Sequence, residues 1–127
     1  ASKSANAAAE AASHVAEQKA EVSFDDFDRM DIRISTIVAA EKVPKTKKLL
    51  KLTVDTGIDR RTIVSGIAEY FKPEELVGRQ VPVLVNLAPR ELKGIRSEGM
   101  ILMAEDAVRG LVMMEPGEKV ADGSQVG

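Results

Sequence analysis

Residues 49–65, LLKLTVDTGIDRRTIVS, contain two segments in which apolar and polar side chains alternate. In residues 49–56, leucine and valine alternate with lysine, threonine and aspartate, which is the period-two pattern of a strand with one buried face. Gly57 begins a short turn, and residues 60–65 return as a second strand rich in β-branched side chains. The pattern predicts an antiparallel hairpin.

Outward from this hairpin, the chain continues to read as short strands separated by turn residues. Five strands with a helix between the third and fourth are the order of an oligonucleotide- or oligosaccharide-binding (OB) barrel. Pro82 lacks an N–H group for a sheet ladder, so it predicts an edge or an end position for its strand. Besides the hairpin, the sequence predicts strands at residues 31–41, 80–86 and 100–104, a short helix within residues 67–76 and a C-terminal β extension at residues 110–114.

The length of 127 residues, with 44% hydrophobic side chains, suits one domain with its own core. Residues 1–23 are rich in Ala, Glu, Ser and Lys and have little apolar bulk, so we expect a disordered linker or a frayed helix there. Residues 24–127 form the predicted domain. Its aromatic side chains are expected in the core, and they are Phe24, Phe27, Tyr70 and Phe71.

The composition gives little support to catalysis. The chain has no cysteine and one histidine, His14, which lies in the predicted linker. The sequence therefore excludes a thiolate nucleophile, a disulfide, a Ser-His-Asp grouping and a zinc site built from Cys or His. We expect no metal and no catalytic residue in it. The absence of a long apolar run and of a signal-peptide pattern predicts a soluble, cytoplasmic protein with no membrane partner.

The net charge of −2 conceals a strong asymmetry along the chain. Residues 29–96 hold fourteen Lys or Arg against eight Asp or Glu, a net of +6. Residues 1–28 and 97–127 each hold two basic and six acidic residues, a net of −4. Because local potential governs the attraction of a polyanion, the basic middle block indicates an anionic partner.

The basic residues concentrate on the two loops that frame the ligand face of an OB barrel, here residues 42–48 and 88–99. Such a cluster can neutralise several phosphates, although a solvated lysine surface is the alternative. The predicted strands offer no aromatic platform for base stacking, which favours a folded RNA read by shape. The eight basic residues on or beside these loops are Lys42, Lys45, Lys47, Lys48, Lys51, Arg90, Lys93 and Arg96.

Residues 24–127 resemble the tRNA-binding domain found at the C-terminus of bacterial methionyl-tRNA synthetases, whose relatives include free-standing tRNA-binding proteins and CsaA-type secretion chaperones. The most specific elements are V-S-G at residues 64–66, N-L-x-P at residues 86–89 and S-x-G-M at residues 97–100. The resemblance implies an OB fold, sequence-independent binding of tRNA and no expected binding of DNA. It also implies a synthetase parent in which ATP, and zinc where present, belong to the catalytic region, so that this domain needs no cofactor.

The resemblance also supplies candidate site residues. Many members have His-Pro at the start of the first loop, where this chain has Val43-Pro44, so Lys45 or Lys47 must supply the charge. Together, the loop charges and the resemblance give a predicted tRNA-binding set of Arg33, Lys45, Lys47, Lys48, Asn86, Arg90, Lys93, Arg96, Ser97 and Met100.

A run of apolar residues near the C-terminus predicts a homodimer, because a small barrel has few elements left to cover it. The predicted interface residues are Leu111, Val112, Met113 and Met114. The leading hypothesis is thus a tRNA-capturing, dimerising appendage of a synthetase. A free-standing tRNA-binding protein and a secretion chaperone remain the alternatives, and the paucity of exposed aromatics counts against the chaperone.

Overall fold

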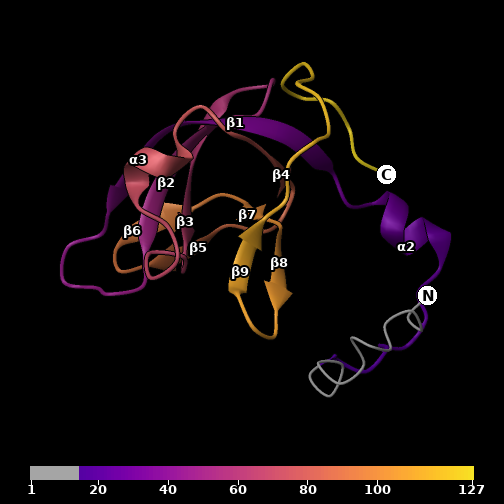
Figure 1. The fold of residues 1–127 in the computed structure, drawn as a ribbon. Helices are drawn as coiled ribbons and strands as arrows, with labels where there is room; N and C mark the ends of the chain where they lie inside the picture. Colours follow the sequence, from indigo (N-terminus) through magenta and orange to yellow (C-terminus); the bar gives the residue numbers. More distant parts are fainter. Residues whose placement is uncertain (1–14) are drawn as a thin grey trace.

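Five strands form one antiparallel sheet in the order β3-β2-β1-β4-β7, which curls into a nearly closed barrel (Figure 1). The computed structural model describes residues 15–127. Two further strand pairs, β5 with β6 and β8 with β9, form separate two-stranded ribbons. The strands are β1 (Ile32–Lys42), β2 (Leu50–Asp55), β3 (Arg60–Ser65), β4 (Gln80–Leu84), β5 (Arg90–Leu92), β6 (Ile95–Ser97), β7 (Met100–Ile101), β8 (Met103–Asp106) and β9 (Gly110–Met113).

The long strand β1 belongs to both sides of the barrel. Its first half, residues 32–36, pairs with β4, and its second half, residues 36–42, pairs with β2. The register of the β1–β2 pair shifts between Ile37 and Ala39. An extra residue of this kind bends a strand and increases its twist, which lets β1 pass from one side of the barrel to the other.

The barrel closes where β3 meets the segment around β6 and β7. The Val64 amide donates to the Ser97 hydroxyl at 2.9 Å, and the Glu98 amide donates to the Thr62 carbonyl at 2.9 Å. Ser97 is buried. A side-chain hydroxyl thus takes the place of a ladder carbonyl at the seam of the barrel.

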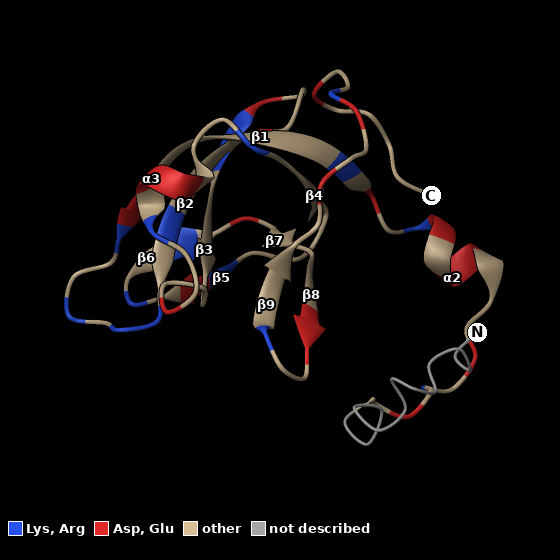
Figure 2. Cartoon of the chain, viewed as in Figure 1, with Lys and Arg blue, Asp and Glu red and all other residues tan. Residues whose placement is uncertain are grey.

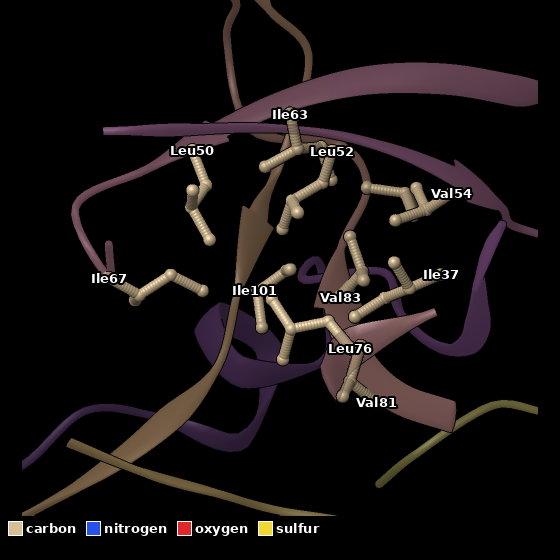
Figure 3. Close-up of a cluster of buried hydrophobic side chains, with 11 residues drawn as sticks. Ile37, Leu50, Leu52, Val54, Ile63, Ile67, Leu76, Val81, Val83 and Ile101 are labelled. Carbon is tan, nitrogen blue, oxygen red and sulfur yellow. The ribbon is translucent and has the colours of Figure 1, made fainter. Parts of the chain in front are cut away.

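The core lies inside the barrel and consists of aliphatic side chains (Figure 3). Strands β1 to β4 and β7 each contribute inward-facing residues to it. In β2, alternate residues are buried, as expected for a strand with one face toward the core. Leu76 of helix α3 (Pro73–Leu76) is fully buried in the same cluster, so α3 covers one end of the barrel. The cluster comprises Ile37, Leu50, Leu52, Val54, Ile63, Ile67, Leu76, Val81, Val83, Val85 and Ile101.

These elements confirm the predicted OB-type barrel with a short helix between the third and fourth strands. The helix is shorter than residues 67–76 because Pro73 occupies its first turn and the residues before it form turns. The edge position predicted from Pro82 is wrong, because β4 lies between β1 and β7. The Pro82 carbonyl accepts from the Leu102 amide. The nitrogen of Pro82 points to the same side, toward Leu102, which lies just past the end of β7, so the ladder does not need an N–H group there.

The predicted burial of the aromatic residues is wrong for Phe24, Phe27 and Tyr70, which are 73%, 40% and 48% exposed. Phe71 is partly buried against the core. Phe24 and Phe27 lie on helix α2 (Phe24–Asp28), which is absent from the elements predicted above. The Ser23 hydroxyl caps this helix by accepting from the Asp26 amide at 3.1 Å. In Figure 1, α2 stands beside the barrel, which explains why its aromatics do not enter the core.

The predicted linker covers residues 1–23. Residues 1–14 lie outside the described part of the chain. Residues 15–23 are exposed and form no helix or strand.

The C-terminal segment, residues 114–127, covers the half of β1 that β2 leaves free. The Ile34 amide donates to the Ser124 carbonyl, and the Ile34 carbonyl accepts from the Gly123 amide, both at 2.8 Å. The Thr36 hydroxyl donates to the Asp122 carboxylate at 2.6 Å. Arg33 and Gln125 form an isolated antiparallel bridge. After the β8–β9 ribbon, the chain therefore returns to the five-stranded sheet and pairs with the free edge of the first half of β1.

Candidate functional site

The second basic loop, residues 88–99, contains a hairpin that the sequence pattern did not reveal. Strands β5 and β6 pair through Leu92 and Ile95, which leaves Lys93 and Gly94 as a two-residue turn. Their φ angles are 51° and 80°, as a type I′ turn requires. The hairpin exposes Lys93 at its tip and holds Arg90 and Arg96 on its two strands.

The first basic loop joins β1 to β2 and is closed by its own hydrogen bonds. The Val43 amide donates to the Leu49 carbonyl at 3.2 Å, and the Thr46 hydroxyl donates to the Val43 carbonyl at 2.8 Å. Val43 is buried, so it anchors the loop to the barrel. The lysines at positions 45, 47 and 48 are all exposed.

Five basic side chains on these loops keep their charge uncompensated. Among residues 15–127, no ion pair involves Lys42, Lys45, Lys47, Lys48, Arg90 or Lys93. Lys42 is the last residue of β1, and we call the other five residues the basic cluster. Figure 2 shows Lys and Arg on the loop after β1 and around β2, whereas Asp and Glu mark α2, α3 and β8. This separation leaves a positive surface on the barrel.

Two neighbouring basic residues are partly neutralised. Arg96 pairs with Glu98 at 3.3 Å, and Lys51 pairs with Glu41 at 3.7 Å. Both pairs are exposed enough that a polyanion can compete for the cation at small cost.

Arg33 lies away from the lysines of the first basic loop. It lies near the start of β1, nine residues and about 30 Å of strand before Lys42. Its guanidinium forms a bidentate pair with Asp31, at 2.9 and 3.1 Å. The structure thus separates this predicted binding residue from the first basic loop.

Asn86 uses both ends of its amide within the chain. Its Oδ1 accepts from the Asp31 amide at 2.9 Å, and its Nδ2 donates to the Arg29 carbonyl at 2.7 Å. These bonds join the end of β4 to the segment before β1. In this structure Asn86 therefore organises the fold near α2.

Ser97, the last residue of β6, and Met100, the first residue of β7, line a pocket of about 310 Å³. Ser97 is 4% exposed, whereas the Met100 side chain is 44% exposed at the start of β7. Gly99 lies between them. Its φ is 152°, and the Leu84 carbonyl lies 3.0 Å from the point that a Cβ atom would occupy. Glycine is therefore needed here because the backbone of β4 comes close, and not because a ligand does.

Arg61, which is outside the predicted binding set, organises this region. Its guanidinium donates to the carbonyls of Val85 and Glu98, at 2.8 and 3.2 Å, and to the Asp59 carboxylate. The hydrogen bonds that Arg61 donates to the Asp59 carboxylate lower the pKa of Asp59 and raise the pKa of Arg61. An Asp-x-Arg spacing in a hairpin turn is too common a pattern to reveal this role from sequence.

Within residues 15–127, no group of three or more His, Cys, Asp or Glu side chains could hold a metal ion. His14 lies outside this range. None of the helices that the structure describes is long and apolar enough to cross a membrane.

The fold and the exposed basic surface define an OB-type barrel suited to an anionic ligand. The chain belongs to the family described as "Putative tRNA binding domain", whose model matches residues 32–125. The predicted family resemblance is thereby confirmed.

Among sequence relatives, methionine–tRNA ligase of Cytophaga hutchinsonii is 65% identical over 109 residues, which cover 86% of this chain and 16% of the relative. Methionine–tRNA ligase of Bacteroides fragilis is 55% identical over 108 residues, covering 85% and 16%. The chain therefore spans about a sixth of the length of these relatives.

Among solved structures, a MetRS-related protein of Pyrococcus horikoshii superposes with a TM-score of 0.80 at 37% identity, covering 85% of this chain and 99% of that one. The chaperone CsaA of Bacillus anthracis gives a TM-score of 0.77 at 28% identity, covering 85% and 100%. The same fold thus occurs in proteins named for different roles.

Proposed function

We propose that this chain is the tRNA-capturing domain of a methionine–tRNA ligase, which holds tRNA through backbone phosphates without reading its sequence. The family assignment and the relatives support tRNA as the partner. The catalytic centre, with its ATP and any zinc, would lie in the rest of the enzyme. Tethering tRNA would raise its effective concentration there, in the cytoplasm.

The observation that carries this proposal is the basic cluster, five exposed cations without ion pairs on two loops of one barrel, within residues 15–127. Flexible lysines can follow the phosphates of a folded RNA without demanding one base sequence. Strands β2 and β3 contain no aromatic residue, so a row of stacked bases has no platform there. Shape and charge are the remaining means of recognition.

Binding of bulk tRNA measured across a range of salt concentrations tests the proposal. Each phosphate contact contributes about 0.7 to 0.9 to the slope of log affinity against log salt, so the five residues of the basic cluster predict a slope of about −3.5 to −4.5. Duplex DNA of equal length and unfolded peptides are the comparison ligands. Salt-insensitive binding, or equal affinity for DNA, would contradict capture of tRNA by shape and charge.

We propose further that two copies associate through an apolar face formed by α2 and the C-terminal segment. Leu111 and Met113 pack partly against the core, so of the four predicted interface residues Met114 is the one that stays 45% exposed. It lines a pocket of about 460 Å³ that shares residues 125–127 with a second pocket beside α2. The exposed side chains of this apolar face are Phe27, Met30, Met114, Val120 and Val126.

The chaperone hypothesis gains support from the same apolar face, since Phe27, expected in the core, is exposed there and the CsaA structure shares the fold. An exposed apolar surface can bind unfolded polypeptide as well as a second copy. A competition experiment with unfolded peptides distinguishes these two occupants of the apolar face. If unfolded peptides bind without displacing tRNA and without splitting a dimer, the chaperone activity belongs to a separate surface.

A further inference from the structure

A pocket of about 310 Å³ lies next to the basic cluster. We call it the hairpin pocket. Its walls come from the end of β3, the segment after β4 and the link between β6 and β7. The lining residues are Val64, Leu87, Ala88, Arg90, Ser97, Gly99 and Met100.

Most of the residues that line the hairpin pocket are apolar. A surface that bound phosphates alone would be expected to be lined by polar residues. Leu87 and Met100 remain 38% and 44% exposed, although neither belongs to the apolar face near α2. Arg90 lies in the same lining and has no ion pair within residues 15–127. Apolar walls with a few polar groups are typical of sites for small flat ligands, and guanidinium planes stack on nucleobases.

Ser97 places one polar group in this pocket. Its hydroxyl oxygen accepts from the Val64 amide at 2.9 Å, and the side chain is 4% exposed. Among the described residues, the structure records no acceptor for the hydroxyl hydrogen. The buried hydroxyl thus keeps one donor for a ligand.

The pocket is held open by bonds from outside it. Arg61 donates to the carbonyls of Val85 and Glu98, which flank the two connecting segments of the lining. Gly99 lies close to Leu84 in a backbone conformation that other residues rarely adopt. A site built in this way needs little rearrangement to bind.

We propose that the hairpin pocket receives one unstacked nucleobase of the bound tRNA. The base lies against Leu87 and Met100, its polar edge accepts from the Ser97 hydroxyl, and Arg90 with Lys93 holds the adjoining phosphates. Every nucleobase has an apolar face and an edge acceptor, so the pocket is indifferent to base identity. The inference rests on the proposed function and adds to it a contact that does not depend on salt.

The test compares tRNA affinity across salt for Ala88→Leu, which fills the pocket, and Met100→Ala, which removes a wall. Neither changes charge. We expect each to weaken binding about fivefold to tenfold, in the lower range of base contacts, with the salt slope unchanged. Ala104→Leu, at an exposed site on β8, is the matched control and should bind as the unmodified protein does.

Amide NMR spectra with adenosine 5′-monophosphate and with ribose 5-phosphate, each to about 10 mM to reach millimolar Kd values, identify the group that binds. The nucleotide should shift the Leu87, Ala88 and Met100 amides, and the sugar phosphate should not. Equal shifts with both ligands would assign the pocket to phosphate and overturn the proposal. Unchanged tRNA affinity in both pocket variants overturns it while leaving tRNA capture intact, whereas no tRNA binding by the unmodified chain overturns both.

Discussion

The Nη1 atom of Arg61 donates a 2.8 Å hydrogen bond to the carbonyl of Val85, 24 residues away in sequence. The same atom lies 3.2 Å from the Glu98 carbonyl, and Asp59 holds the other side of the guanidinium. One side chain therefore joins β3 to the ends of the two segments that carry the hairpin pocket.

Replacement of Arg61 by lysine should destabilise the fold, because an ammonium group cannot match the planar fork of the guanidinium. Hydrogen bonds to charged groups contribute about 1.5 to 3 kcal/mol each, and the Arg61 side chain is 19% exposed. We expect a loss in this range from urea denaturation. Arg60→Lys, at a side chain that is 67% exposed, is the control. An equal loss in both variants would contradict the bridging role.

The stability of the fold should fall with acid partly through Asp59. The hydrogen bond from Arg61 lowers its pKa in the folded state, below about 3.9 for an unfolded chain. Its contribution is present above that value and is lost as pH falls through the lower folded pKa. Urea midpoints measured between about pH 2.5 and 6 should therefore decline less for Asp59→Asn than for the unmodified protein. In an Arg61→Gln background, where the Thr56 hydroxyl still donates to Asp59, the difference between the two curves should become smaller.

Removal of one cation from the basic cluster should weaken tRNA binding and lower its salt dependence. Lys47→Gln removes one phosphate contact, so the slope of log affinity against log salt should decrease by about 0.7 to 0.9. Lys119→Gln removes an exposed lysine of the C-terminal segment and should change neither quantity. Loss for one tRNA species alone would instead indicate sequence reading.

Charge on the apolar face should separate the proposed dimer. Phe27→Asp with Val126→Asp places two carboxylates in adjacent pockets, where burial against a second copy is costly. Light scattering should give twice 13.7 kDa for the unmodified chain and 13.7 kDa for the variant. Val108→Asp, at a position 84% exposed on the β8–β9 turn, should remain dimeric. A single-chain mass for the unmodified protein would reject the dimer.

Gly57→Ala should loosen the C-terminal segment. Gly57 has a φ of 86°, and an added Cβ would overlap the Asp122 carbonyl. The left-handed conformation alone costs about 1 to 2 kcal/mol for a residue with a side chain. We expect a lower unfolding free energy and faster amide exchange at residues 123–126. Gly117→Ala, which meets no atom within 4 Å, is the control.

The barrel was predictable because β2 alternates strictly and the neighbouring strands are rich in β-branched residues bounded by turns. Residues 50–55 and 60–65 form β2 and β3 as expected, and a short helix before β4 was expected from the helical spacing of residues 67–76. Strands β5 and β6 are three residues each, too short for a period to emerge. The Lys93-Gly94 turn was the one available signal, since Gly tolerates the positive φ that the hairpin needs.

Side-chain environment was less predictable than strand position. Phe27 is expected in the core because it is apolar, but its helix lies outside the barrel. A serine followed three residues later by an aspartate, Ser23 and Asp26, was the signal for that helix. Which cations lie free and which are paired depends on contacts between distant residues, as Arg61 and Val85 show, and local patterns carry no such information.

α2 and the C-terminal segment lie at one end of β1, and the first basic loop lies at the other. Between them β1 follows a bent path of about 30 Å. If this loop holds tRNA, the eleven residues of β1 act as a spacer between the bound tRNA and α2.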